Sequence, residues 1–119
     1  MTGREVCARY QIPMKVLQEY ERWGLCGAVR MAMEDWHYDD QDLERLSLIM
    51  ALHDMEFSTS EVETYMKFLL AGDSTRSERI RMLEKRRSKM LDEIHLRERQ
   101  LARMDYLRHE IRKDNGQTN

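Results

Sequence analysis

Cysteine, proline, glycine and long hydrophobic runs are all scarce in this chain. Its 119 residues include two cysteines, one proline and five glycines. Cys7 and Cys26 lie far apart and form no C-x-x-C pair, so neither a disulfide framework nor a zinc site is predicted. No stretch approaches the roughly 18 apolar residues of a membrane span, and no charged-then-apolar signal opens the chain. We therefore expect a soluble protein of the reducing cytoplasm.

Aromatic residues are few and charged residues are many. They make up 8% and 35% of the chain, which favours helices with wide solvated faces over a large sandwich or barrel core. No glycine-rich phosphate loop, nucleophile elbow or paired-carboxylate cleft can be assembled. The histidines are scattered without an i, i+4 partner, at His37, His53, His95 and His109. The sequence therefore predicts no enzyme activity, no metal site and no cofactor.

The charge is divided unevenly along the chain. Residues 1–72 hold seven Lys/Arg against thirteen Asp/Glu, a net charge of −6, whereas residues 73–119 hold thirteen against nine, a net charge of +4. Phosphate neutralisation supplies most of the affinity of DNA-binding domains, which are therefore usually basic. The acidity of the N-terminal part is an argument against strong DNA binding.

Helical signals follow one another closely through the first 72 residues. We expect helices over about 2–10 and 12–24, with Thr2 as N-cap, Pro13 at the first helical position and a turn at Gln11-Ile12, the spacing of a helix-turn-helix. Residues 27–37 lack a helical period and are predicted to form a two-stranded hairpin. A helix over 40–55 carries an apolar stripe, and another begins at Ser58 or Ser60 and ends at Gly72.

The C-terminal part predicts one long helix with a heptad seam. A helix over 76–113 would be about 57 Å long at about 1.5 Å per residue. With Ile80 at position a, the a residues are Ile80, Arg87, Ile94, Leu101 and Arg108, and the d residues are Leu83, Met90, Arg97, Met104 and Ile111. Seven of these ten are apolar, as in a coiled coil. The expected dimer interface is Ile80, Leu83, Met90, Ile94, Leu101, Met104 and Ile111, and residues 114–119 are expected to be a disordered tail.

The order of residues in the first part resembles the MerR family of bacterial transcription regulators. The matching positions are Ile12, Lys15, Leu17, Tyr20, Glu21, Gly24, Leu25, Arg30, Tyr38, Asp42, Leu43, Arg45, Leu46, Ile49, Leu52, Phe57 and Ser58. The resemblance implies an all-α protein: a winged helix-turn-helix DNA-binding domain over 1–72 with a small two-stranded wing, then a coiled-coil dimerisation helix over 73–113.

The resemblance also implies which residues contact DNA. They are Lys15, Gln18, Tyr20, Arg22, Arg30 and Tyr38. The alternative for the helix over 12–24 is an ordinary amphipathic helix with Leu17, Tyr20 and Trp23 in the core. Three departures weaken the DNA-binding interpretation: Gln11 replaces a glycine, Glu19 replaces an aromatic residue and would repel phosphate, and Glu34-Asp35-Trp36 replaces Gly-Tyr-Arg in the wing.

The function implied by the resemblance is transcription regulation by a homodimer with antiparallel dimerisation helices. Members of the family bind a two-fold operator within an overlong promoter spacer and distort the duplex so that RNA polymerase can engage both promoter elements. The cysteines of metal-sensing members are missing, so metal sensing is not carried over. The alternative is a protein-interaction adaptor that uses the same fold, with its acidic surface facing a protein partner.

Overall fold

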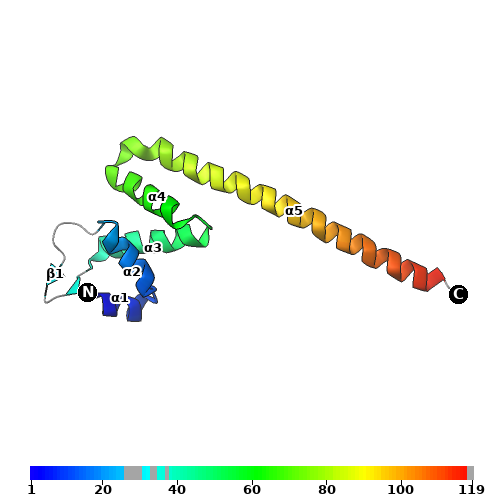
Figure 1. Cartoon of the computed structure of the whole chain (residues 1–119), viewed down its shortest axis with the longest axis horizontal. Helices are drawn as coiled ribbons and strands as arrows, with labels where there is room; N and C mark the ends of the chain where they lie inside the picture. The colour runs from blue at the N-terminus through cyan, green and yellow to red at the C-terminus, as the bar shows by residue number, and fades with distance from the viewer. Residues whose placement is uncertain (26–30, 33–34, 37, 118–119) are drawn as a thin grey trace. The chain divides into compact units, whose positions relative to one another are not determined.

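The structure, a computed structural model, describes residues 1–25, 31–32, 35–36 and 38–117 (Figure 1). The elements are α1 (Gly3–Tyr10), α2 (Met14–Arg22), β1 (Met31–Ala32), β2 (Asp35–Trp36), α3 (Asp40–Asp54), α4 (Thr59–Ala71), the short 3-10 helix η1 (Asp73–Thr75) and α5 (Arg76–Gln117). The chain divides into two units, Met1–Ile80 and Arg81–Asn119. The predicted all-helical class is confirmed, and the division between the two units falls within α5.

The helix-turn-helix forms as the local signals predict, with one shift in register. The hydroxyl of Thr2 caps α1 by accepting from the Glu5 amide at 3.3 Å. Gln11 ends α1 in the left-handed region at φ 54°, which residues other than glycine rarely adopt. Pro13 has an extended backbone with ψ 140°. It is therefore the N-cap of α2 and not, as predicted, the first helical residue. The extended backbone of Pro13 turns the chain so that the first helical residue is Met14.

The next two helices begin with reciprocal caps. Asp39 and Asp42 form a capping box at the start of α3, and Ser58 and Glu61 form one at the start of α4. Each cap satisfies backbone amides that have no partner within their helix. After α4 the chain turns at Gly72, whose φ of 99° lies in a region that side chains disfavour. These signals confirm the predicted order of helices in the first unit.

The core of the first unit is built from apolar residues on the inner faces of its helices. It includes Val6, Ile12, Val16, Leu17, Tyr20, Leu46, Ile49, Leu52, Val62 and Met66. The predicted stripe of α3 is thus buried at Leu46, Ile49 and Leu52. Because α2 and α4 both pack on α3, this helix forms the base on which the outer face of α2 is presented.

A short antiparallel pair lies within the segment predicted to be a hairpin. Met31 on β1 pairs with Trp36 on β2, and Ala32 pairs with Asp35. The other residues of the predicted segment 27–37 lie outside the part of the chain that the structure describes.

The C-terminal helix is longer than predicted. α5 continues to Gln117. The tail is predicted to be disordered from residue 114, but its residues 114–117 are helical. The described tail contains no proline, and its first three residues, Asp114, Asn115 and Gly116, do not stop the helix. No helix among the described residues is long and apolar enough to cross a membrane.

Candidate nucleic-acid interface

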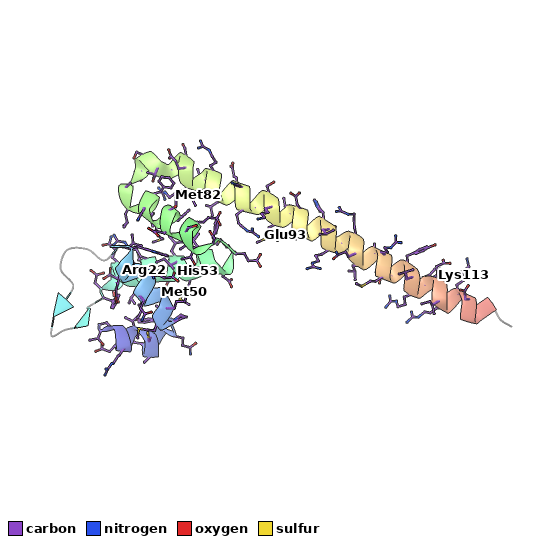
Figure 2. The ribbon with its side chains drawn as sticks, viewed as in Figure 1. Arg22, Met50, His53, Met82, Glu93 and Lys113 are labelled. Atoms are coloured by element: carbon purple, nitrogen blue, oxygen red, sulfur yellow. The ribbon has the colours of Figure 1, made fainter. Side chains whose placement is uncertain are left out.

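The outer face of α2 carries four exposed side chains. Met14, Gln18 and Arg22 follow one another at i, i+4 and i+8, and Lys15 lies beside them. On the opposite side, Val16, Leu17, Glu19 and Tyr20 are buried. The helix therefore presents one narrow face of polar, cationic and thioether groups. Figure 2 shows Arg22 on α2, in the same unit as Met50 and His53 of α3.

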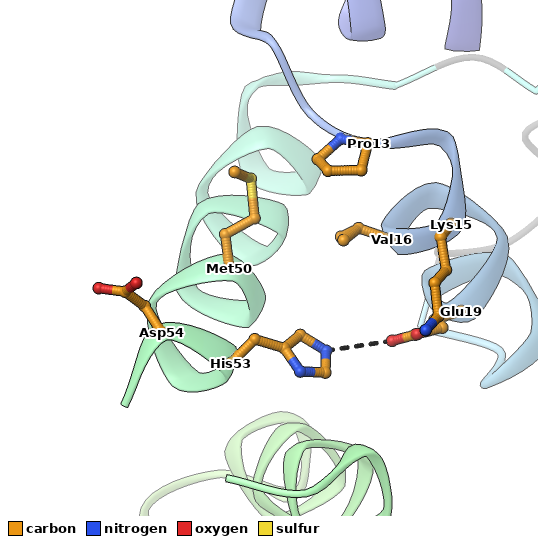
Figure 3. A pocket seen from close by; sticks show the side chains of 7 residues that line it. All are labelled: Pro13, Lys15, Val16, Glu19, Met50, His53 and Asp54. Carbon is orange, nitrogen blue, oxygen red and sulfur yellow. Dashed lines mark hydrogen bonds and ion pairs between the residues drawn. The ribbon is translucent and has the colours of Figure 1, made fainter. Parts of the chain in front are cut away.

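Both carboxylates of α2 are engaged within the protein. Glu19 is 3% exposed, and its Oε2 lies 3.2 Å from Nε2 of His53 on α3 (Figure 3). Glu21 accepts a hydrogen bond from the hydroxyl of Tyr38. The prediction that Glu19 would repel phosphate is wrong, because its carboxylate lies on the inner face of the helix. Neither acid belongs to the exposed face defined by Met14, Lys15, Gln18 and Arg22.

Two tyrosines predicted to contact DNA are instead part of the core. Tyr20 is fully buried, and its hydroxyl donates to Oδ1 of Asp42, whose Oδ2 accepts from the Asp39 amide at 3.0 Å. Tyr38 is 3% exposed, and its ring centroid lies 6.4 Å from that of Tyr20. Both are therefore removed from the set of predicted DNA contacts. The alternative role for Tyr20, as a core residue with Leu17 and Trp23, is confirmed by their burial.

A third polar contact holds the end of α2. The guanidinium of Arg45 on α3 donates to the carbonyl oxygen of Leu25 at 3.1 Å. Together with the contacts of Glu19 and Tyr20, it fixes the C-terminal half of α2 against α3. Sequence reasoning assigned no role to the Glu19–His53 pair. The signal was present, since Glu19 lies three residues after Val16 on the buried side and His53 lies four residues after Ile49.

A shallow pocket of about 390 Å³ opens between α2 and α3. Figure 3 shows its lining residues, which are Pro13, Lys15, Val16, Glu19, Met50, His53 and Asp54. Its walls are mostly apolar, and its one histidine is already paired with Glu19. Among the described residues, no three His, Cys, Asp or Glu side chains gather as a metal site requires.

Of the remaining predicted DNA contacts, Lys15, Gln18 and Arg22 are brought together and one is not described. The first three share the exposed face of α2. Arg30 lies outside the described residues. Sequence reasoning also missed Met14, which is 48% exposed at the first position of α2.

The heptad seam of α5 is a second exposed surface. Its apolar residues leave large areas uncovered in the single chain: Ile80 is 53% exposed, Ile94 45%, Leu101 59%, Met104 65% and Ile111 64%. Leu83 is also exposed and Met90 is half-buried. The predicted interface residues thus lie on one continuous helix, and a large part of their apolar surface remains available to a partner.

Comparison with known proteins identifies the family through the first part of the chain. The family model described as "MerR HTH family regulatory protein" matches residues 1–69. The match spans more than half of the chain, and the chain therefore belongs to the MerR family of helix-turn-helix regulators. No curated protein matches it.

Solved structures share the fold. HiNmlR, a MerR family regulator lacking the sensor domain and bound to promoter DNA, is 22% identical with a TM-score of 0.67, covering 98% of this chain and 93% of that chain. A putative MerR family transcriptional regulator from Listeria monocytogenes is 20% identical with a TM-score of 0.71, covering 100% and 87%. A MerR family regulator from Bacillus thuringiensis is 19% identical with a TM-score of 0.64, covering 89% and 94%.

Proposed function

We propose that this transcription regulator binds promoter DNA as a homodimer, with the exposed face of α2 in the major groove. The observation that carries the proposal is the composition of that face. Lys15 and Arg22 are exposed cations, Gln18 is an exposed amide, and both acids of the helix are engaged elsewhere. A recognition helix needs such a face, because cations contact phosphates while amides read base edges.

The acidity of the first unit is compatible with this role. Its net charge of −6 includes Glu19 and Asp42, which are buried, and Glu44, which is exposed on α3 rather than α2. Charges beyond about 8–10 Å are largely screened at physiological ionic strength. The acidic surface therefore weakens binding to random duplex more than it weakens the close contacts of Lys15 and Arg22.

Each contact residue has a distinct proposed role. Gln18 can pair bidentately with an adenine edge, and Lys15 and Arg22 can hold phosphates or guanine. The β1–β2 pair is proposed as the wing, with Arg30 as its phosphate contact. Tyr20 and Tyr38 act indirectly, because their hydroxyls hold Asp42 and Glu21 and so position α2.

The exposed seam of α5 supports the proposal of a homodimer. In a helix of 42 residues, a seam with seven apolar residues in ten positions gains stability when a partner covers it. The occupant we propose is α5 of a second copy, because the seam arginines select a specific self-pairing. In a parallel pair, each seam arginine would face the same arginine of the second copy. This arrangement places like charges together in three layers, at Arg87, Arg97 and Arg108.

An antiparallel pair removes every one of these clashes. When each a position faces a d position, the layers are Ile80 with Ile111, Leu83 with Arg108, Arg87 with Met104, Met90 with Leu101, and Ile94 with Arg97 of the second copy. All ten seam residues are used, and no arginine faces another. The sequence therefore contains one register in which both copies are fully paired.

The flanking acids fit the same register. The register places Arg87 beside Asp105 of the second copy, and Arg108 beside Glu84 of the second copy. Arg97 lies beside Glu93 of the second copy in this register. Within its own helix, Glu93 accepts a hydrogen bond from Arg86 at 3.4 Å. Each seam arginine thus gains a carboxylate at the rim of the seam, as flanking pairs set partner orientation in coiled coils.

A dimer of this kind would read two half-sites. Its two-fold symmetry requires a pseudo-palindromic operator, with half-site spacing set by the dimer. HiNmlR is described as bound to promoter DNA, and by analogy we propose promoter DNA as the ligand here, with distortion of the duplex allowing RNA polymerase to engage. The protein would act in the cytoplasm, with no metal or cofactor.

The direct test is to select bound fragments from genomic DNA and titrate them with purified protein. A regulator binds a pseudo-palindromic sequence at nanomolar to micromolar concentration of dimer, and Gln18→Ala relaxes preference at one base pair by about 1–3 kcal/mol. The protein-interaction adaptor predicts no specific complex even at low salt. That outcome, with a partner protein recovered by pull-down, would overturn the proposal.

The register has its own test by disulfide trapping, with Cys7 and Cys26 first replaced by serine. Oxidation of the double variant Met90→Cys/Leu101→Cys is expected to give covalent dimers, because the two cysteines face one another across copies. Met90→Cys alone is the control. In the antiparallel pair, position 90 of one copy lies about 16 Å along the helix axis from position 90 of the other, which is too far for a disulfide. Efficient trapping of the single variant would instead indicate a parallel pair.

A further inference from the structure

Met14 is an apolar residue in a face that is otherwise polar. It is 48% exposed, although methionine usually fills cores, and it is the first residue of α2. Gln18 and Arg22 follow it on the same line of the helix, at i+4 and i+8. About half of its surface is open to solvent on the face that carries Lys15, Gln18 and Arg22. Its neighbours therefore indicate that it shares their ligand.

We propose that Met14 contacts a thymine methyl group and selects for thymine at one position of each half-site. The inference rests on the proposed function and deepens it by naming a specificity-determining residue. The first residues of a recognition helix contact base edges, and the C5-methyl of thymine is the apolar group that the major groove displays. An unbranched thioether side chain can adjust to that methyl without a fixed rotamer.

The geometry of α2 places this contact beside the one proposed for Gln18. The two residues lie about 6 Å apart along the helix at about 1.5 Å per residue. Successive base pairs lie about 3.4 Å apart. Met14 would therefore read a thymine within about two base-pair steps of the adenine read by Gln18. An apolar surface of a protein partner fits this face less well than DNA does. Lys15 and Gln18 on the same face would lose their hydration against such a surface.

Replacing single thymidines by deoxyuridine in a selected operator tests the proposal, because it removes only the methyl group. The unaltered protein is expected to lose affinity about fourfold per half-site at one thymine position, the effect of losing one buried methyl. Met14→Ala should bind the thymine operator about fourfold more weakly per half-site. It should show no further loss with deoxyuridine at that position.

Met55→Ala is the matched control, because Met55 is 41% exposed but lies at the end of α3. It should keep the full discrimination between thymine and uracil. Specific binding without any effect of deoxyuridine would overturn the role of Met14 and leave the regulator intact. A deoxyuridine effect that persists in Met14→Ala would assign the methyl contact to another residue. Failure of all duplexes to bind would overturn the proposed function as well.

Discussion

The carboxylate of Glu19 lies 3.2 Å from the imidazole of His53, and this pair joins the inner face of α2 to α3. The Glu19 side chain is 4% exposed and that of His53 is 30% exposed. Tyr20 and Asp42 make a second polar link between the same helices. Two adjacent residues of α2 thus turn inward, which fixes Lys15, Gln18 and Arg22 as the outward face.

The first prediction concerns the His53 contact. His53→Ala should lower the free energy of unfolding by about 1–3 kcal/mol, because the buried Glu19 carboxylate loses its donor. Chemical denaturation measures the change. His95→Ala, on the exposed surface of α5, should stay within about 0.5 kcal/mol of the original protein. In a double-mutant cycle with Glu19→Gln, additivity of the two changes would show that the pair contributes nothing.

The second prediction tests the buried role of Tyr20. Tyr20→Phe should cost about 1–3 kcal/mol of stability, because Oδ1 of the buried Asp42 loses a hydroxyl donor. The exposed Tyr106→Phe on α5 removes the same atom and should have little effect. Base preference in the selected operator should be unchanged by Tyr20→Phe. A change in preference at one base pair would instead restore Tyr20 to the DNA contacts.

The third prediction concerns the turn between α4 and η1. Gly72 has φ 99° and ψ −165°, a region that is essentially restricted to glycine. A Cβ there would meet no atom within 4 Å, so only the backbone opposes a side chain. Gly72→Ala should therefore destabilise the protein by about 1–3 kcal/mol. Gly3→Ala in α1 should be neutral or stabilising, and equal melting temperatures for the two variants would contradict the argument.

The fourth prediction is a shallow dependence of DNA affinity on salt. With few cations available, the slope of log affinity against log salt should be roughly −4 to −6. Arg22→Gln removes one cation from each copy and should make the slope shallower by about 1.8. Arg103→Gln changes the net charge equally but lies on α5, outside the seam. An equal effect of both variants would mean that only net charge matters.

The fifth prediction is that α5 holds the dimer together. Ile94→Lys places a charge in the middle of the seam and should shift the protein towards a 14.4 kDa monomer with a lower melting temperature. His95→Lys, one residue along and outside the seam, should remain dimeric. Light scattering across micromolar concentrations measures the shift. A monomeric original protein would refute the dimer itself.

Local signals in the sequence determined the order of helices and most of their ends. Thr2, Asp39 and Ser58 are caps that act within one turn, so their effect can be predicted without tertiary contacts. The heptads of α5 are equally local, since position along one helix defines them. The helices α2 and α5 depart from their predicted ends, since α2 stops at Arg22 and α5 continues to Gln117.

Tertiary structure decided which residues of α2 face outward. Periodicity alone left Tyr20 open to two roles, because a residue near the edge of an apolar stripe can turn either way. The hydroxyl of Tyr20 donates to Asp42, which is 22 positions further along the chain. Glu19 pairs with His53, which is 34 positions further along. Such pairs depend on how α2 packs against α3. The sequence therefore supplied the helix and its charges, and packing against α3 determined which of them face outward.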